Sequence, residues 1–238
     1  MLEDGLSYPA RGDWIGRILI GGVLGAFTIF LVPVFFLLGY YVRVLESTID
    51  GVEDPPTFDD WGDLLVKGLV AFVIATVYTL VPTFVFGVLF VVLAGILGAG
   101  GAIGGDGGAA FAGLGLLGIL GLVALFVPVM LVVAYLVPAA LANYARHGSI
   151  GAGFDVGALR PILLSADYAI AVLLAIVIGM AGSMVASVAA ATIVGIVLAP
   201  FIHFYANVAI HRVIGVAYAD VHDITPIDHG DAPTPTSV

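Results

Sequence analysis

The chain of 238 residues is 61% hydrophobic and only 10% charged, whereas ordinary soluble domains carry roughly 25% charged residues. Its 17 acidic and 7 basic residues give a net charge of −10, and no basic cluster is present to neutralise phosphates, which excludes nucleic acid as a partner. The chain contains no cysteine, so disulfides, thiolate metal sites and cysteine nucleophiles are excluded as well.

Four long windows of the sequence carry no charged residue, counting histidine as neutral. About 20 apolar residues in a helix cross a bilayer core of about 30 Å, so each window can span a membrane. The last window has 44 residues, about 66 Å of helix, and must therefore hold two spans. We predict an all-α, polytopic transmembrane helical bundle. The windows are 18–42, 69–105, 107–145 and 168–211.

Five spans are expected within a single integral membrane domain, residues 1–218. The first should run over about 14–41 and kink at Pro33. An acidic, proline-containing tail, residues 219–238, is expected to be disordered. The remaining spans are expected at about 69–97, 114–144, 168–188 and 192–217.

The side of the membrane on which the N-terminus lies is left open. Lysine and arginine are enriched in cytoplasmic loops, and Arg43, Lys67, Arg146, Arg160 and Arg212 place the first loop, the third loop and the C-terminus in the cytoplasm. Five spans would then put the N-terminus outside, although it carries two arginines. The alternative is six membrane segments, in which the first apolar region is a re-entrant pair.

The loop before the second span contains a short amphipathic stretch. Apolar residues, including Phe58, Trp61 and Leu64, recur at helical spacing, and Asp59 and Asp63 lie opposite them. This pattern predicts a short interfacial helix ahead of the second span. The acidic, lysine-poor aqueous surface also favours a halophilic source, because concentrated salt screens the repulsion between carboxylates.

The same loop carries a Gly-Tyr-x-x-Arg stretch followed by a Pro-Pro-x-Phe-Asp-x-Trp element. In these elements, and over most of residues 15–218, the chain resembles a family of uncharacterised multi-pass membrane proteins found mostly in halophilic archaea, the domain of unknown function 4013. The resemblance implies a multi-pass fold and a haloarchaeal setting, but no activity. The residues that carry it are Gly39, Tyr40, Arg43, Pro55, Pro56, Phe58, Asp59 and Trp61.

Two further patterns lie within the expected spans. His203, Asn207 and His211 recur every four residues along the last span and form a polar stripe, and polar groups inside a membrane are costly and often functional. Small residues also recur at four-residue spacing, which lets membrane helices approach closely. Those predicted to pack helices together are Gly21, Gly25, Gly179, Ser183 and Ser187.

No catalytic, cofactor-binding or metal-binding motif is recognisable, and the polar loops are too short to hold a catalytic domain. We therefore expect no enzyme and no cofactor. The favoured hypothesis is a non-enzymatic scaffold or accessory subunit of the cell membrane, with the lipid bilayer and either further copies or another membrane protein as partners. The alternative is a small transporter or channel with a pathway near the last span, favoured by the prolines within the spans.

Overall fold

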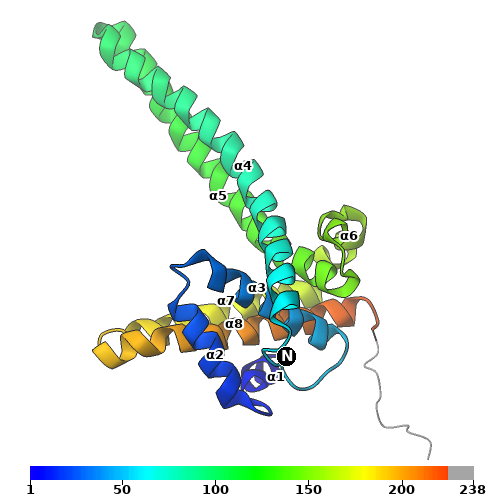
Figure 1. Ribbon diagram of the computed structural model, residues 1–238. Coiled ribbons are helices and arrows are strands. Elements are labelled where there is room, and N and C mark those ends of the chain that lie inside the picture. Colours follow the sequence, from blue (N-terminus) through cyan, green and yellow to red (C-terminus); the bar gives the residue numbers. More distant parts are fainter. Residues whose placement is uncertain (225–238) are drawn as a thin grey trace, which may run out of the picture. The chain divides into compact units, whose positions relative to one another are not determined.

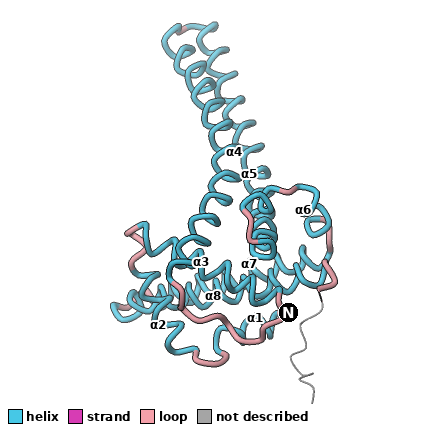
Figure 2. Tube along the Cα trace, turned by 45° about the vertical axis from the view of Figure 1, so that its right-hand side comes forward, coloured by secondary structure: helices cyan, strands magenta, loops and turns pink. Residues whose placement is uncertain are grey.

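The computed structural model describes residues 1–224, which are helical over most of their length and contain no strand (Figure 2). The chain is thus an all-α protein, as predicted. The order of elements is α1 (Leu2–Ser7), η1 (Tyr8–Ala10), α2 (Trp14–Ala26), α3 (Leu31–Ile49), α4 (Trp61–Ile103), α5 (Gly105–His147), η2 (Ile150–Phe154), α6 (Val156–Leu163), α7 (Ala166–Ala189) and α8 (Ile193–Val221).

Five of the described helices are long and apolar enough to cross a membrane, namely α3, α4, α5, α7 and α8, while α2 is a shorter apolar helix. The chain divides into two compact units. The first, which we call the bundle, comprises residues 1–72 and those from 138 onward. The second, which we call the hairpin, comprises residues 73–137 of α4 and α5 (Figure 1).

Helix α8 is the centre of the bundle. It packs against α1, α2, α3, α6 and α7, and its pairing with α7 is the most extensive. Around it lies a core of buried residues that come from distant parts of the chain, among them Tyr8, Tyr40, Leu64, Phe204 and Val208. The last helix therefore holds the N-terminal helices together.

The first apolar region differs from the single kinked span expected over 14–41. Helix α2 ends at Ala26, residues Phe27–Phe30 are not helical, and α3 begins at Leu31. Pro33 therefore lies in the first turn of α3, where its missing N–H costs nothing, rather than in a helix interior. With 13 residues, α2 is about 20 Å long and too short to cross the core alone.

Helices α2 and α3 instead form a hairpin whose two open ends lie together. At the start of α2, the Nη1 atom of Arg17 donates a hydrogen bond of 3.0 Å to the carbonyl of Pro55, in the loop that follows α3. Just before α2, Arg11 donates one of 3.0 Å to the carbonyl of Glu53. Two helices joined by a short turn thus replace the single kinked helix expected over residues 14–41.

The expected short interfacial helix does not exist as a separate element. Helix α4 begins at Trp61 and continues without interruption to Ile103, so the amphipathic stretch forms its first turns. At the other end of the chain, α8 extends to Val221, beyond the expected end of the last span. The predicted disorder of the tail falls almost wholly on residues 225–238, which lie outside the described residues.

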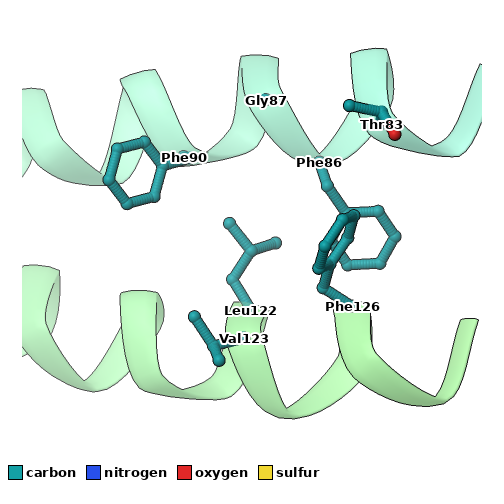
Figure 3. A pocket seen from close by; sticks show the side chains of 7 residues that line it. All are labelled: Thr83, Phe86, Gly87, Phe90, Leu122, Val123 and Phe126. Atoms are coloured by element: carbon teal, nitrogen blue, oxygen red, sulfur yellow. The ribbon is translucent and has the colours of Figure 1, made fainter. Parts of the chain in front are cut away.

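Apolar side chains pack between the two helices of the hairpin. Phe86 and Phe126 meet edge to face with their ring centroids 5.2 Å apart, beside an apolar gap of about 210 Å³ at Gly87 (Figure 3). The hydroxyls of Thr79 and Thr83 donate hydrogen bonds of 2.8 and 2.7 Å to carbonyls one turn earlier in α4, which is the usual way to satisfy them in an apolar helix.

Candidate functional site

The loop after α3 packs its aromatic residues against that helix. The Tyr40 hydroxyl donates a hydrogen bond of 3.0 Å to the carbonyl of Pro56, and its ring stacks on Phe58 with 4.1 Å between centroids. Phe58 stacks in turn on Trp61 at 5.9 Å. Residues that are separated in the sequence by the whole loop thus form one aromatic cluster, which fixes the path of the loop.

Two glycines bring the backbones of α3 and α4 into direct contact at this cluster. A Cβ atom on Gly39 would lie 1.8 Å from the carbonyl oxygen of Leu64, and one on Gly68 would lie 1.7 Å from that of Phe35. No side chain fits at either position, because the opposing atoms are backbone. The glycine of the Gly-Tyr-x-x-Arg stretch is therefore required by helix packing.

Arg43 lies on the same face of α3 and is part of a network of ion pairs. Its guanidinium pairs with Asp59 in the loop and, at 3.0 Å, with Asp63 in the first turn of α4. Lys67 bridges Asp63 at 3.0 Å and Glu46 at 2.6 Å. Hydrogen bonds from Thr57 and Arg43 hold the pKa of the Asp59 carboxyl below its usual range. The network ties α3, the loop and α4 together.

The N-terminal segment is joined to the C-terminal part of α8. The Nε atom of Arg212 lies 2.9 Å from the carboxylate of Asp4, and the Nη1 atom donates a hydrogen bond of 3.1 Å to the carbonyl of Val52. Arg11 pairs with the same carboxylate at 2.6 Å. Partial burial acts to raise the pKa of Asp4, but hydrogen bonds from Arg212 and Arg11 outweigh it and lower the pKa. Burial raises the pKa of Tyr8, although the guanidinium of Arg212, 4.5 Å from the ring centroid, acts to lower it.

Charged residues of the bundle consequently gather at one end, which we call the charged end. It is formed by the N-terminal segment, residues 50–60, and the C-terminal turns of α5 and α8, where Arg146 lies 3.1 Å from Asp50. Arg17 is buried there and donates only to backbone carbonyls, those of Pro55 and Arg11. The α2–α3 and α7–α8 turns contain no charged residue.

The small residues singled out in the sequence have different surroundings. A Cβ atom on Gly21 would lie 2.4 Å from the ring of Phe204, and one on Gly25 would lie 3.2 Å from Pro200. Both glycines therefore let α2 approach α8. Gly22, which the spacing did not single out, does the same against Phe201.

On α7, the face that packs against α8 differs from the line of small residues predicted at four-residue spacing. Gly179 is in ordinary contact with α8, whereas Ser183 and Ser187 are exposed in the chain taken by itself. Gly182 approaches α8 instead, where a Cβ atom would lie 2.8 Å from Ala206. Four residues advance about 400° around a helix, which is about 40° more than a full turn. Residues spaced by four therefore rotate gradually around the helix and leave the packed face.

The three residues of the polar stripe on α8 also have different environments. His211 stacks on Tyr41 with 4.7 Å between ring centroids, and its Nδ1 lies 2.7 Å from the carbonyl of Asn207. Since a carbonyl only accepts, Nδ1 carries the proton. The side-chain amide of Asn207 donates a hydrogen bond of 2.8 Å to the carbonyl of His203. The His203 side chain is exposed and makes no hydrogen bond within the described part of the chain.

His203 and Asn207 line a cavity of about 400 Å³ between α2, α3 and α8, which we call the His203 cavity. Tyr41 and Thr28 contribute the remaining polar groups, and no lining residue is charged. The cavity lies beside the non-helical turn between α2 and α3, to which Thr28 belongs. Irregular backbone at membrane depth is tolerated where it lines a cavity or is buried in protein.

Some contacts could not be predicted from the sequence. Asn143 is buried, accepts a hydrogen bond of 2.7 Å from Tyr218 and donates one of 2.7 Å to Ala152, so it links α5, α8 and the loop after α5. Its spacing does not distinguish it from any other polar residue near a span end. Among the residues described, no group of three or more histidine or acidic side chains could hold a metal ion.

Comparison with known proteins assigns the chain to a family. The family model "Protein of unknown function (DUF4013)" matches residues 23–194. The chain therefore belongs to this family, as the two loop elements predicted, and it is a multi-pass helical membrane protein. No curated protein and no solved structure matches it.

Proposed function

We propose that the protein is a non-enzymatic membrane scaffold or accessory subunit that associates with further copies of itself through the hairpin. The observation that carries the proposal is the environment of its glycines. Within the described residues, eight helical glycines of the hairpin have no heavy atom, other than nearby backbone of their own helix, within 4 Å of the position of a Cβ. They are Gly87, Gly95, Gly98, Gly101, Gly105, Gly107, Gly113 and Gly121.

The hairpin uses other glycines for its own packing. Cβ atoms on Gly100 and Gly115 would lie 2.4 and 2.7 Å from backbone atoms of the facing helix. The unopposed glycines Gly95 and Gly98 lie three residues apart and so on one side of α4. A glycine in contact with lipid gains nothing, whereas small residues at a helix–helix contact let the backbones approach closely. A second hairpin supplies the missing contact.

The absence of cysteine from the chain makes this proposal easy to test. Replacing Gly98 by cysteine, and exposed Val92 by cysteine as the matched control on another face of α4, gives two proteins with one thiol each. Oxidative crosslinking in native membranes should give a covalent dimer of the 24.4 kDa chain from Gly98→Cys and little from Val92→Cys. No dimer from Gly98→Cys, or equal amounts from both, would contradict self-association through this face.

A second candidate function is transport, with a pathway near the last helix. The non-helical turn at Phe27–Phe30 beside the uncharged polar His203 cavity favours it, because broken helices in transporters mark binding sites. His203→Ala should then lower solute uptake into vesicles, whereas His211→Ala should act through packing and lower the amount of folded protein. Unchanged uptake of the candidate solutes in both variants would count against a histidine-lined pathway.

We further propose that the charged end faces the cytoplasm of a halophilic archaeon. The arrangement of α2 and α3 supports this orientation, since Arg11 and Arg17 lie at the same end of the bundle as the loop after α3, in keeping with the positive-inside rule. Single cysteines at Ser7 and Ser149 should both be shielded from a membrane-impermeant maleimide in intact cells and react after lysis. Labelling of both cysteines in intact cells would reverse the proposed orientation. Labelling of only one would place the two segments on opposite sides of the membrane.

A further inference from the structure

The His203 cavity has the chemical character of a binding site for a neutral ligand. Its volume of about 400 Å³ lies within the range of small-molecule sites, which are mostly apolar with a few polar groups that orient the ligand. Leu37 and Ile196 contribute apolar surface, while Thr28, Tyr41, His203 and Asn207 supply hydrogen-bonding groups. No charged side chain lines it, so an ionic head group would be left without a counter-charge.

The polar groups of the cavity are not used equally by the protein itself. The Thr28 hydroxyl donates 2.9 Å to the carbonyl of Gly25, and the Asn207 amide donates to the carbonyl of His203. The Tyr41 hydroxyl and the His203 imidazole make no hydrogen bond within residues 1–224. The Tyr41 hydroxyl and the neutral His203 imidazole therefore each have one N–H or O–H donor left for a ligand, besides an acceptor atom, and carbonyl oxygens of a ligand can accept from both donors.

We propose that the His203 cavity binds the head group of a lipid-soluble quinone, a planar neutral ring with two carbonyl acceptors. Tyr41 and His203 donate to the carbonyls, and the apolar lining with Phe204 covers the ring. The aromatic rings of Tyr41 and Phe204, whose centroids lie 6.1 Å apart with their planes inclined by 29°, provide aromatic surface next to which a planar ring can pack. The site involves binding only, and it does not depend on the hairpin contacts proposed above.

The experiment measures binding of a naphthoquinone with a short prenyl tail to the full chain in nanodiscs, relative to empty nanodiscs. Saturable binding is expected for the wild type. His203→Leu should weaken it about tenfold, since one hydrogen bond to the ligand is lost. Ala199→Leu fills the cavity and should weaken binding at least as much. The matched control is Ala181→Leu, which lines a separate apolar cavity between α7 and α8 and should leave binding unchanged.

Two further probes test the chemistry of the head group. A naphthalene with the same tail but no carbonyls should bind at least tenfold more weakly, and dodecanoate should not compete. Equal binding of the hydrocarbon, competition by the fatty acid, or loss of binding in Ala181→Leu but not in Ala199→Leu would each overturn the proposal. Saturable quinone binding without solute uptake would support the site while counting against the transport function.

Discussion

Glycine has opposite surroundings in the two units of this protein. In the bundle, Gly39 and Gly68 lie where the backbone of another helix comes closer than any side chain would allow, and Gly22 lies against a phenylalanine ring. In the hairpin, Gly98, Gly113 and others face open space. Small residues that a chain already uses explain its fold, whereas those it leaves unopposed indicate contacts that the single chain does not make.

The largest expected effect comes from exchanging glycine for alanine in each unit. Gly39→Ala forces a methyl group into the backbone of Leu64 and should destabilise the protein by about 3 kcal/mol, lowering the unfolding temperature by on the order of 10 °C. Gly121→Ala meets no atom in the single chain and, in detergent that keeps the protein monomeric, should stabilise its helix by about 0.5–1 kcal/mol. Thermal unfolding in mild detergent measures both, and equal shifts would remove the contrast.

A hydrogen bond between elements should matter more than one within a helix. Tyr40→Phe leaves the carbonyl of Pro56 without its donor and should cost about 1–2 kcal/mol. Thr83→Val, in the hairpin, removes a hydroxyl that bonds only to its own helix and should change stability by less than about 0.5 kcal/mol. A loss from Thr83→Val as large as that from Tyr40→Phe would show that the hairpin depends on polar contacts too.

Acid should loosen the charged end of the bundle. The pKa of Asp4 is lower in the folded protein than in the unfolded chain, so its contribution is fully present above the unfolded value of about 3.9 and is lost as the pH falls through the folded value. The carboxylate is partly exposed, so the contribution should stay below about 1 kcal/mol. Unfolding followed from pH 6 to pH 2.5 measures it, and Asp4→Asn should remove this part of the pH dependence.

The smallest effect is expected at the exposed pair of Arg146 and Asp50. Asp50→Asn should cost at most about 0.5 kcal/mol, and the difference should vanish in concentrated salt, because solvent and ions screen such pairs. Denaturant unfolding at low and high potassium chloride measures it. A loss above about 1 kcal/mol that persists at high salt would mean that Asp50 has a buried role.

The sequence allowed the membrane spans to be predicted, because length and hydropathy of charge-free windows are strong signals. It did not locate the break at Phe27–Phe30, because all residues around it are apolar and a proline is tolerated both in a kinked helix and in a first turn. Tyr40 of α3, Phe58 of the following loop and Trp61 of α4 could be assigned to a family but not to a shared cluster. That cluster depends on how the loop folds back, which local patterns do not encode.

The pairing of Asp4 with Arg212 has a consequence for the order in which the protein is completed during synthesis. Partners of α1, α2 and α3 lie on α8, which is synthesised after all the other described helices, so the core around the first three helices cannot close until α8 has been made. The hairpin contains only contacts between neighbouring helices and can form as soon as α5 is made. A chain truncated before α8 should therefore retain the hairpin and leave its N-terminal helices open to proteolysis.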